Sequence, residues 1–138
     1  MLATVNDCRV ITRPKISDNR GNLTFAEGGG HIPFRVERVF WVYDIPSGAE
    51  RGAHAHHALH QFLVCLSGGL DVQLDDGERQ RVVHLNRPWL GLHIPPMIWA
   101  SEGNFDTNTV YAVMASAAYD ADDYLRDHDG FLAARKGR

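Results

Sequence analysis

Four of the chain's eight histidines fall in one short stretch, SGAERGAHAHHALHQ, from Ser47 to Gln61. Two of them, His54 and His56, are separated by a single residue, and an extended strand points both imidazoles of such a pair to one side. The pair fits three interpretations: half of a metal site, a proton-handling pair that titrates near neutral pH, or two solvated histidines on an edge strand. His57 and His60 are expected to be bystanders.

The metal interpretation can be tested by counting along the chain, because the spacing resembles the two-part motif of the cupin superfamily. The positions that keep the motif's residue types are Gly48, His54, His56, Gly68, Pro95 and Asn104. Gln61 stands where the motif has a glutamate ligand, and Ala100 stands where it has a third histidine. Zinc and iron sites normally use three or more His, Cys or carboxylate ligands. We therefore expect no metal and no cofactor.

Acid–base chemistry suits the pair better. Arg51 and Gly52 precede it and an apolar strand follows it, which favours a position beside a barrel interior rather than on a solvated edge. Two histidines on one face can serve two atoms of one small substrate, as in isomerisation or epimerisation next to a carbonyl. Such a reaction needs no metal when hydrogen-bond donors stabilise the enolate oxygen.

The chain as a whole resembles the sugar-nucleotide 3,4-ketoisomerases, small cupins that move the keto group of a dTDP-4-keto-6-deoxyhexose from C4 to C3. The residues that carry the resemblance are Asp18, Arg20, Gly21, Leu23, Glu27, Ile32, Pro33, Phe34, Arg38, Tyr43, Arg51, Gly52, His54, Ala55, His56, Gln61, Trp99, Ser116, Tyr119, Asp123, Tyr124, Arg126, Asp127 and Phe131. The resemblance implies a homodimeric jelly roll, dTDP-4-keto-6-deoxy-D-glucose as substrate, and a downstream aminotransferase that makes a 3-amino sugar.

The resemblance also implies catalytic roles. One histidine removes the C3 proton, an enediol(ate) forms, and a proton is returned at C4, while the other histidine shuttles protons between the two oxygens or holds the substrate. We assign His54 as the base and His56 as its partner, an assignment that could be exchanged. Tyr43 and Arg51 are candidates to stabilise the enediolate oxygens, and Gln61 is a candidate to orient a histidine.

Substrate binding calls for cations and a flat apolar surface. Arg20 and Arg38 are expected to meet the diphosphate, and Trp99, or alternatively Trp41, is expected to stack on the thymine. Each residue also has a structural alternative. Tyr43 and Trp41 fit a packed strand, Arg20 fits an ion pair with Asp18 or Glu27, and Trp99 fits a dimer interface. The run DADD, residues 120–123, fits a solvated helix start.

These residues need an all-β framework, and the strand signals are short and frequent. Segments rich in β-branched and aromatic residues alternate with turn formers such as DNRGN, DDGE and SEGN, as in a sandwich or barrel. We therefore expect one domain over residues 1–138, a cupin-type jelly-roll β-barrel with short C-terminal helices. Asp120 is a candidate N-cap for the tail, and Gly130 is expected to break it into two helical pieces.

Two strand segments, Val39 to Tyr43 and Phe62 to Leu66, are apolar without alternation, so both of their faces should be covered. A second protomer suits so much aromatic surface, and the alternative cover is the C-terminal tail of the same chain. Cys65 lies in the second segment and is expected to be a buried thiol.

Composition limits the function classes. The net charge of −3 provides no basic field for nucleic acid or an anionic membrane, and no apolar run has the length of a membrane span or a signal peptide. We expect a cytoplasmic protein. Three alternatives to the ketoisomerase stay open: a 3,5-epimerase, whose histidine base pairs with an aspartate and works with a tyrosine acid; a non-catalytic sugar-nucleotide-binding cupin; and a metal-dependent oxygenase, which Gln61 and Ala100 disfavour.

Overall fold

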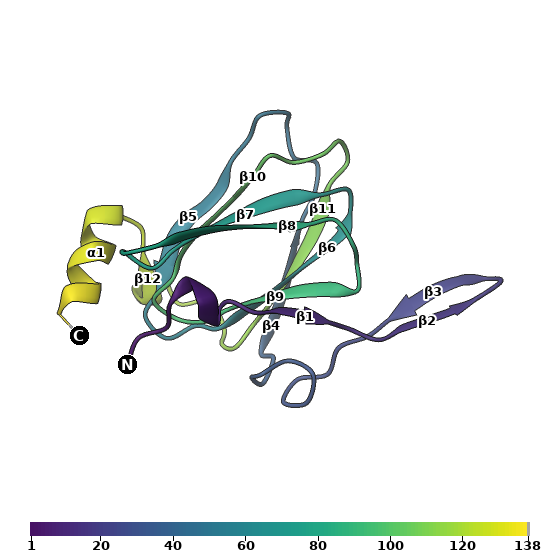
Figure 1. The fold of residues 1–138 in the computed structure, drawn as a ribbon, viewed down its shortest axis with the longest axis horizontal. Helices are drawn as coiled ribbons and strands as arrows, with labels where there is room; N and C mark the ends of the chain where they lie inside the picture. The colour runs from purple at the N-terminus through teal and green to yellow at the C-terminus, as the bar shows by residue number, and fades with distance from the viewer. Residues whose placement is uncertain (138) are drawn as a thin grey trace.

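The structure is a computed structural model that describes residues 1–137. Its elements are η1 (Val5–Asp7), β1 (Val10–Thr12), β2 (Lys15–Asp18), β3 (Gly21–Thr24), β4 (Arg38–Val42), β5 (Arg51–His56), β6 (Gln61–Ser67), β7 (Leu70–Asp75), β8 (Gln80–Leu85), β9 (Leu90–Ile94), β10 (Trp99–Gly103), β11 (Val110–Ala115), η2 (Ala121–Asp123), β12 (Tyr124–Leu125) and α1 (His128–Lys136). Two five-stranded sheets pack face to face, and the β2–β3 hairpin projects away from them as an arm (Figure 1).

One sheet has the order β1-β9-β6-β11-β4 and the other β12-β5-β10-β7-β8, and every strand pair in them is antiparallel. The inward-facing side chains of both sheets form one apolar core, which includes Leu63 and Leu92 from the first sheet and Val72 and Leu74 from the second. This two-sheet sandwich is the all-β jelly-roll architecture expected from the spacing of strands and turns.

The first sheet also carries apolar side chains on its outer face. Phe62 and Val64 point outward from β6 and join Ile32 in a second buried cluster beneath the loop between β3 and β4. β6 is therefore covered on both sides from Phe62 to Cys65, as its lack of alternation predicted, whereas Leu66 is exposed; Cys65 is a buried thiol.

β4 differs from β6, because its outer face is open. Phe40 and Val42 face the interior, whereas Val39, Trp41 and Tyr43 are exposed, with Trp41 62% accessible. The C-terminal tail does not cover them, because α1 packs near β5 and β12 at the far end of the sandwich (Figure 1).

The tail forms two helical pieces, but the break does not lie at Gly130. Asp120 caps the short 3-10 helix η2, strand β12 follows, and Asp127 then caps α1 by accepting the Gly130 amide at 2.9 Å. Helix α1 runs through Gly130 without interruption, and Phe131 anchors it in the protein. Among residues 1–137, no helix has the length and apolarity to cross a bilayer.

Candidate active site

Strand β5 positions the two histidines. His54 and His56 alternate with Ala55 and so lie on one face of the strand, with ring centroids 5.0 Å apart and planes at 86°. Their common orientation confirms the expected geometry of the pair. A bulge lies just before them, where the pairing of β5 with β10 shifts register and Gly52 and Ala53 adopt φ values of 78° and 60°. Such a bulge re-aims the neighbouring side chains.

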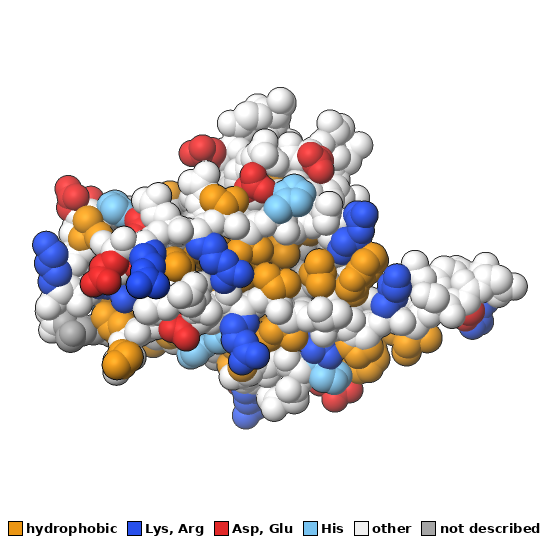
Figure 2. Space-filling view, in the orientation of Figure 1, with side chains coloured by type: hydrophobic (Ala, Val, Ile, Leu, Met, Phe, Trp, Pro, Cys, Tyr) orange, Lys and Arg blue, Asp and Glu red, His pale blue; other side chains and the backbone are white. Residues whose placement is uncertain are grey.

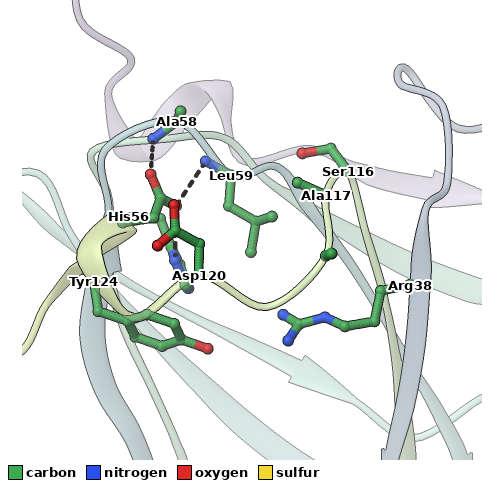
Figure 3. Close-up of a pocket in the computed structure, with 10 residues that line it drawn as sticks. Arg38, His56, Ala58, Leu59, Ser116, Ala117, Asp120 and Tyr124 are labelled. Atoms are coloured by element: carbon green, nitrogen blue, oxygen red, sulfur yellow. Dashed lines mark hydrogen bonds and ion pairs between the residues drawn. The ribbon is translucent and has the colours of Figure 1, made fainter.

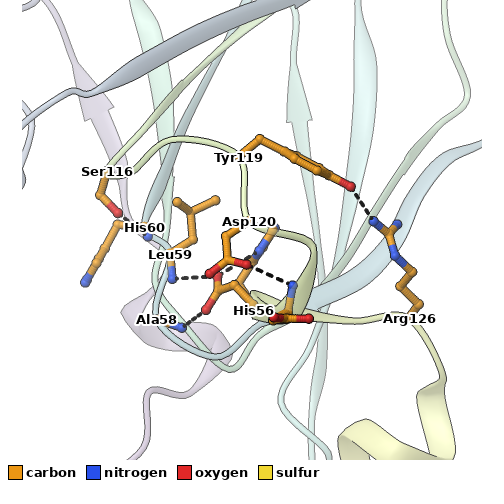
Figure 4. A network of polar contacts seen from close by, with 10 residues as sticks. His56, Ala58, Leu59, His60, Ser116, Tyr119, Asp120 and Arg126 are labelled. Carbon is orange, nitrogen blue, oxygen red and sulfur yellow. Dashed lines mark hydrogen bonds and ion pairs between the residues drawn. The ribbon is translucent and has the colours of Figure 1, made fainter.

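His56 is oriented by a carboxylate. Its Nδ1 lies 3.2 Å from Oδ2 of Asp123, and Asp123 also accepts the amides of Ala58 at 2.9 Å and Leu59 at 3.2 Å (Figure 4). Because a carboxylate accepts hydrogen bonds, Nδ1 of His56 carries the proton and Nε2 is left as the acceptor. That Nε2 is buried and has no hydrogen-bond partner among the described residues.

Burial keeps both imidazoles neutral. It lowers the pKa of His56 from 6.5 to about 4, aided by the neighbouring His54, and it also lowers the pKa of His54, with the Arg126 charge acting in the same direction. The Asp123 carboxylate opposes this shift in His56 but does not cancel it. A neutral imidazole is the form that can accept a proton from carbon.

Two adjoining cavities give access to the pair. The larger, of about 370 Å³, opens into the sandwich and is lined by His54, Arg51, Gln61 and further residues of β4, β10 and β11. The smaller, of about 150 Å³, is lined by His56, Arg38 and the segment that leads into η2. Tyr124 lines both cavities, and its ring lies 5.0 Å from the ring of His54 and 4.3 Å from that of His56.

The smaller cavity is lined by a cationic side chain, Arg38, whose hydrogen-bonding capacity is not fully used. Arg38 and Tyr124 reach into it from opposite sides (Figure 3). The Nε of Arg38 is buried without a partner among residues 1–137, and its guanidinium lies 5.2 Å from the Phe40 ring and 5.7 Å from the Tyr119 ring. A guanidinium held by ring contacts rather than by a carboxylate is suited to meet a phosphate oxygen.

The structure thus brings together His54, Arg51 and Gln61 in one cavity and His56 and Arg38 in the other. Three predicted site residues lie elsewhere in the single chain. Tyr43 follows Val42 on β4 and so falls on the outer face. Trp99 faces away from the cavity because Ala100 faces it, and its ring packs against His128 and Phe131 at 5.1 and 5.7 Å.

Arg20 is the third. It lies at the tip of the arm, where its guanidinium pairs with Asp18 at 2.7 Å, which is the ion-pair alternative that the sequence left open. The Asp120–Asp123 run, in contrast, is more than a solvated helix start, because Asp123 bonds to His56.

Several cavity residues were not assigned a role from the sequence. Tyr119, Tyr124 and Arg126 contributed only to the resemblance, yet all three line the larger cavity, where Arg126 lies 4.1 Å from the Tyr124 ring and 3.4 Å from the Tyr119 hydroxyl. Glu102 and Tyr111 were missed altogether. The only sequence signal for them is the two-residue period, which puts Glu102 on the face of Ala100 in β10 and Tyr111 on the face of Val113 in β11.

The structure places Ala100 directly opposite His54 in the β5–β10 pairing, so a methyl group stands across from the histidine pair. Among residues 1–137, no three His, Cys, Asp or Glu side chains are grouped closely enough to share a metal ion.

Comparison with known proteins identifies the family of the chain. The family model FdtA, described as "WxcM-like, C-terminal", matches residues 6–136. TDP-4-oxo-6-deoxy-alpha-D-glucose-3,4-oxoisomerase of Aneurinibacillus thermoaerophilus is 41% identical over 123 residues, which cover 89% of this chain and 88% of the relative.

Solved structures agree. QdtA, a sugar 3,4-ketoisomerase from Thermoanaerobacterium thermosaccharolyticum solved in complex with TDP, superposes with a TM-score of 0.94 at 34% identity, covering 98% of each chain. NovW, a 4-keto-6-deoxy sugar epimerase from Streptomyces spheroides, superposes with a TM-score of 0.71 at 14% identity, covering 83% of this chain and 66% of NovW. The likeness to NovW is one of fold alone.

Proposed function

The chain belongs to the FdtA, WxcM-like family, and we propose that it is an isomerase that moves the keto group of a dTDP-4-keto-6-deoxyhexose from C4 to C3. The observation that carries this function beyond the family is the pair of neutral imidazoles on one face of β5, both bordering a cavity. Incubation with dTDP-4-keto-6-deoxy-D-glucose, followed by NMR of the product, tests it.

The reaction only relocates protons. The C4 carbonyl acidifies the C3 proton, a neutral imidazole removes it, and the electron pair moves to give an enediolate with its charge on O4. O4 then takes up a proton, O3 gives one up, and C4 is protonated, so the product carries the carbonyl at C3 and a hydroxyl at C4. One group must serve carbon and another must serve the oxygens.

We assign His54 to carbon and His56 to the oxygens. His54 lines the larger cavity, which has room for a hexose ring, and Arg51 and Gln61 line the same cavity as donors. His56 is held by Asp123 with Nε2 free, an arrangement that suits a group that accepts a proton from one oxygen and returns it to the other. The Asp123 carboxylate stabilises the imidazolium while His56 holds that proton.

For substrate binding, Arg38 is the candidate for the diphosphate, because its Nε has no partner in the described structure. The aromatic groups that line the cavities are Tyr119 and Tyr124, which makes them stacking surfaces for the thymine in place of Trp99.

We further propose that the chain acts as a homodimer. The open face of β4 exposes Val39 and Trp41, the arm exposes Ile16 and Leu23, and hydrophobic side chains gather near the base of the arm (Figure 2). Such apolar surface is typical of a subunit interface. Arg20 stays a candidate for diphosphate binding only through the dimer, because an arm that reaches a second copy would carry it to that copy's site. An aminotransferase acting on the 3-keto product remains the expected next enzyme.

A 3,5-epimerase is the second candidate function, and one observation favours it. The His56–Asp123 bond beside Tyr124 is the combination of an aspartate-paired base and a tyrosine that we associated with the epimerases. The relatives at 34–41% identity are ketoisomerases by name, and the epimerase neighbour shares only the fold, so the ketoisomerase is the better conclusion. A non-catalytic sugar-nucleotide-binding cupin would bind dTDP without turnover.

A further inference from the structure

The inner wall of the larger cavity carries two polar residues to which the proposed isomerisation assigns no role, Glu102 and Tyr111. Glu102 on β10 and Tyr111 on β11 line the cavity together with Arg51 on β5. The Tyr111 hydroxyl lies 3.4 Å from Oε1 of Glu102, and the Arg51 guanidinium is close enough for its charge to act on both groups. The Tyr111 ring is buried and stacks on Phe105 at 5.9 Å and 12°, which fixes the direction of its hydroxyl.

The fold makes room for this carboxyl. Gly52 lies beside it at the β5 bulge with φ +78°, and a Cβ at that position would collide with Oε2 of Glu102 and come within 3.1 Å of the Ala100 carbonyl oxygen. The carboxyl therefore occupies the space of a side chain that Gly52 does not have. A carboxyl carried to a shaped position on an inner wall, rather than to solvent, is unusual unless it has a task.

The surroundings of Glu102 favour its protonated form. Burial raises its pKa from 4.5 to about 7, and the Tyr111 hydrogen bond and the Arg51 charge reduce this shift without cancelling it. Burial and the nearby Glu102 raise the pKa of the Tyr111 hydroxyl as well, so the phenol keeps its proton. From β7, the residue paired with Glu102 is Val72, which brings no charge, and His54 and Arg126 line the same cavity.

Building on the proposed isomerase function, we propose that the Tyr111 hydroxyl donates to the enediolate oxygen and that Glu102 is the positioning residue that frees it to do so. A protonated Glu102 donates its own O–H to the Tyr111 oxygen, which leaves the phenolic O–H to point into the cavity. An ionised Glu102 instead accepts a hydrogen bond from the phenolic O–H, which turns the donor away from the substrate. Tyr111 thereby takes the role that the sequence suggested for Tyr43.

The kinetic test compares pH profiles of kcat for the wild type, Glu102→Gln and Tyr111→Phe. In the wild type, kcat should fall as the pH rises above about 7, where Glu102 ionises. Glu102→Gln should keep kcat near neutral pH, because an amide N–H also donates to the Tyr111 oxygen, and should lose this alkaline limb. Tyr111→Phe should lower kcat by about 100-fold, with little change in KM.

The control is Ser101→Ala, at the next position of β10 but on its outer face, which should leave the profile unchanged. An alkaline limb that persists unchanged in Glu102→Gln would overturn the proposal, as would wild-type kcat in Tyr111→Phe. Thermal unfolding of each variant separates these outcomes from loss of the fold.

An infrared difference spectrum provides a readout that needs no turnover. At pH 6, the wild type minus Glu102→Gln should show the carbonyl band of a protonated carboxylic acid, and this band should vanish as the pH is raised past the Glu102 pKa of about 7. Absence of the band at pH 6 would overturn the proposal. If the band is present but no substrate is isomerised, the proposed function fails while the buried acid stands.

Discussion

The Nδ1 atom of His56 lies 3.2 Å from Oδ2 of Asp123, and these two residues are 67 positions apart in the chain. The contact exists because β12 pairs with β5 and sets Tyr124 opposite His56, with Asp123 just before it. The end of η2, held in place by the β5–β12 pairing, thus supplies the group that decides which nitrogen of His56 is free.

Replacing Asp123 should remove the carboxylate that orients His56. In Asp123→Asn the amide cannot stabilise the imidazolium, so we expect kcat to fall about 10-fold to 100-fold while dTDP affinity changes little. Steady-state kinetics and calorimetry measure the two quantities. Asp122→Asn, at the exposed neighbouring position, is the matched control and should behave as the wild type. Equal kinetics for the two variants would remove the aspartate from the mechanism.

Replacing either histidine should remove turnover without removing binding. Loss of a general acid or base costs roughly 10²–10⁴-fold in rate, and we expect His54→Asn and His56→Asn to fall in that range while dTDP still binds in a calorimetric titration. His57→Asn, on the same segment, serves as the comparison. Loss of nucleotide binding together with activity would instead indicate a structural role for the pair.

Acid should destabilise the fold through its buried histidines. The pKa of His56 and that of His93 are each lowered from 6.5 to about 4 by burial, and His60, whose Nδ1 lies 3.0 Å from Nε2 of His93, is shifted in the same direction. The unfolded chain therefore binds protons between pH 6.5 and 4 that the folded chain excludes. Stability is fully present above pH 6.5 and falls as the pH decreases through this interval.

Urea unfolding of Glu102→Gln at pH 7, 6 and 5 measures this loss, because in the wild type the raised pKa of Glu102, about 7, adds stability as the pH falls and offsets it. Each unit of pKa shift corresponds to about 1.4 kcal/mol, so the free energy of unfolding should decrease by a few kcal/mol in total. His93→Gln removes one titrating group and should flatten the slope. A free energy of unfolding that is constant from pH 7 to pH 5 in Glu102→Gln would contradict the assignment of neutral imidazoles.

The open apolar faces should be covered in solution. Light scattering at micromolar concentration should give twice the chain mass of 15.4 kDa. Trp41→Asp places a charge on the exposed face of β4 and should favour the monomer, whereas Val82→Asp, on an exposed position of β8, is the matched control. A wild-type chain that scatters as a monomer would refute the dimer.

Part of the framework was predictable, because runs rich in β-branched and aromatic residues indicate strands. β4 and β6 overlap the two apolar segments that the sequence marked as strands, Val39 to Tyr43 and Phe62 to Leu66. Turn residues misled at one place: SEGN, at 101–104, was interpreted as a turn, yet Ser101, Glu102 and Gly103 belong to β10. The missed strand hid Glu102, since a glutamate in a turn is expected to face water.

The site was predictable where one strand carries it and not where the tail meets the barrel. His54 and His56 share a face by the two-residue period of β5 alone. The Asp123 contact depends on the β5–β12 pairing, which no local pattern in a run of aspartates signals. The same two-residue period accounts for the outward positions of Trp99 and Tyr43. It could not be applied from the sequence alone, because the sequence does not show that Ala100 and Val42 are the residues that face inward.

The most direct test is incubation with dTDP-4-keto-6-deoxy-D-glucose in heavy water, with NMR of the product. The ketoisomerase predicts a product with its carbonyl at C3 and deuterium at C4, formed by the wild type and lost in His54→Asn. A product that keeps its carbonyl at C4 and carries deuterium at C3 and C5 would instead show an epimerase. Recovery of unchanged, unlabelled substrate would contradict any catalytic role for the histidine pair.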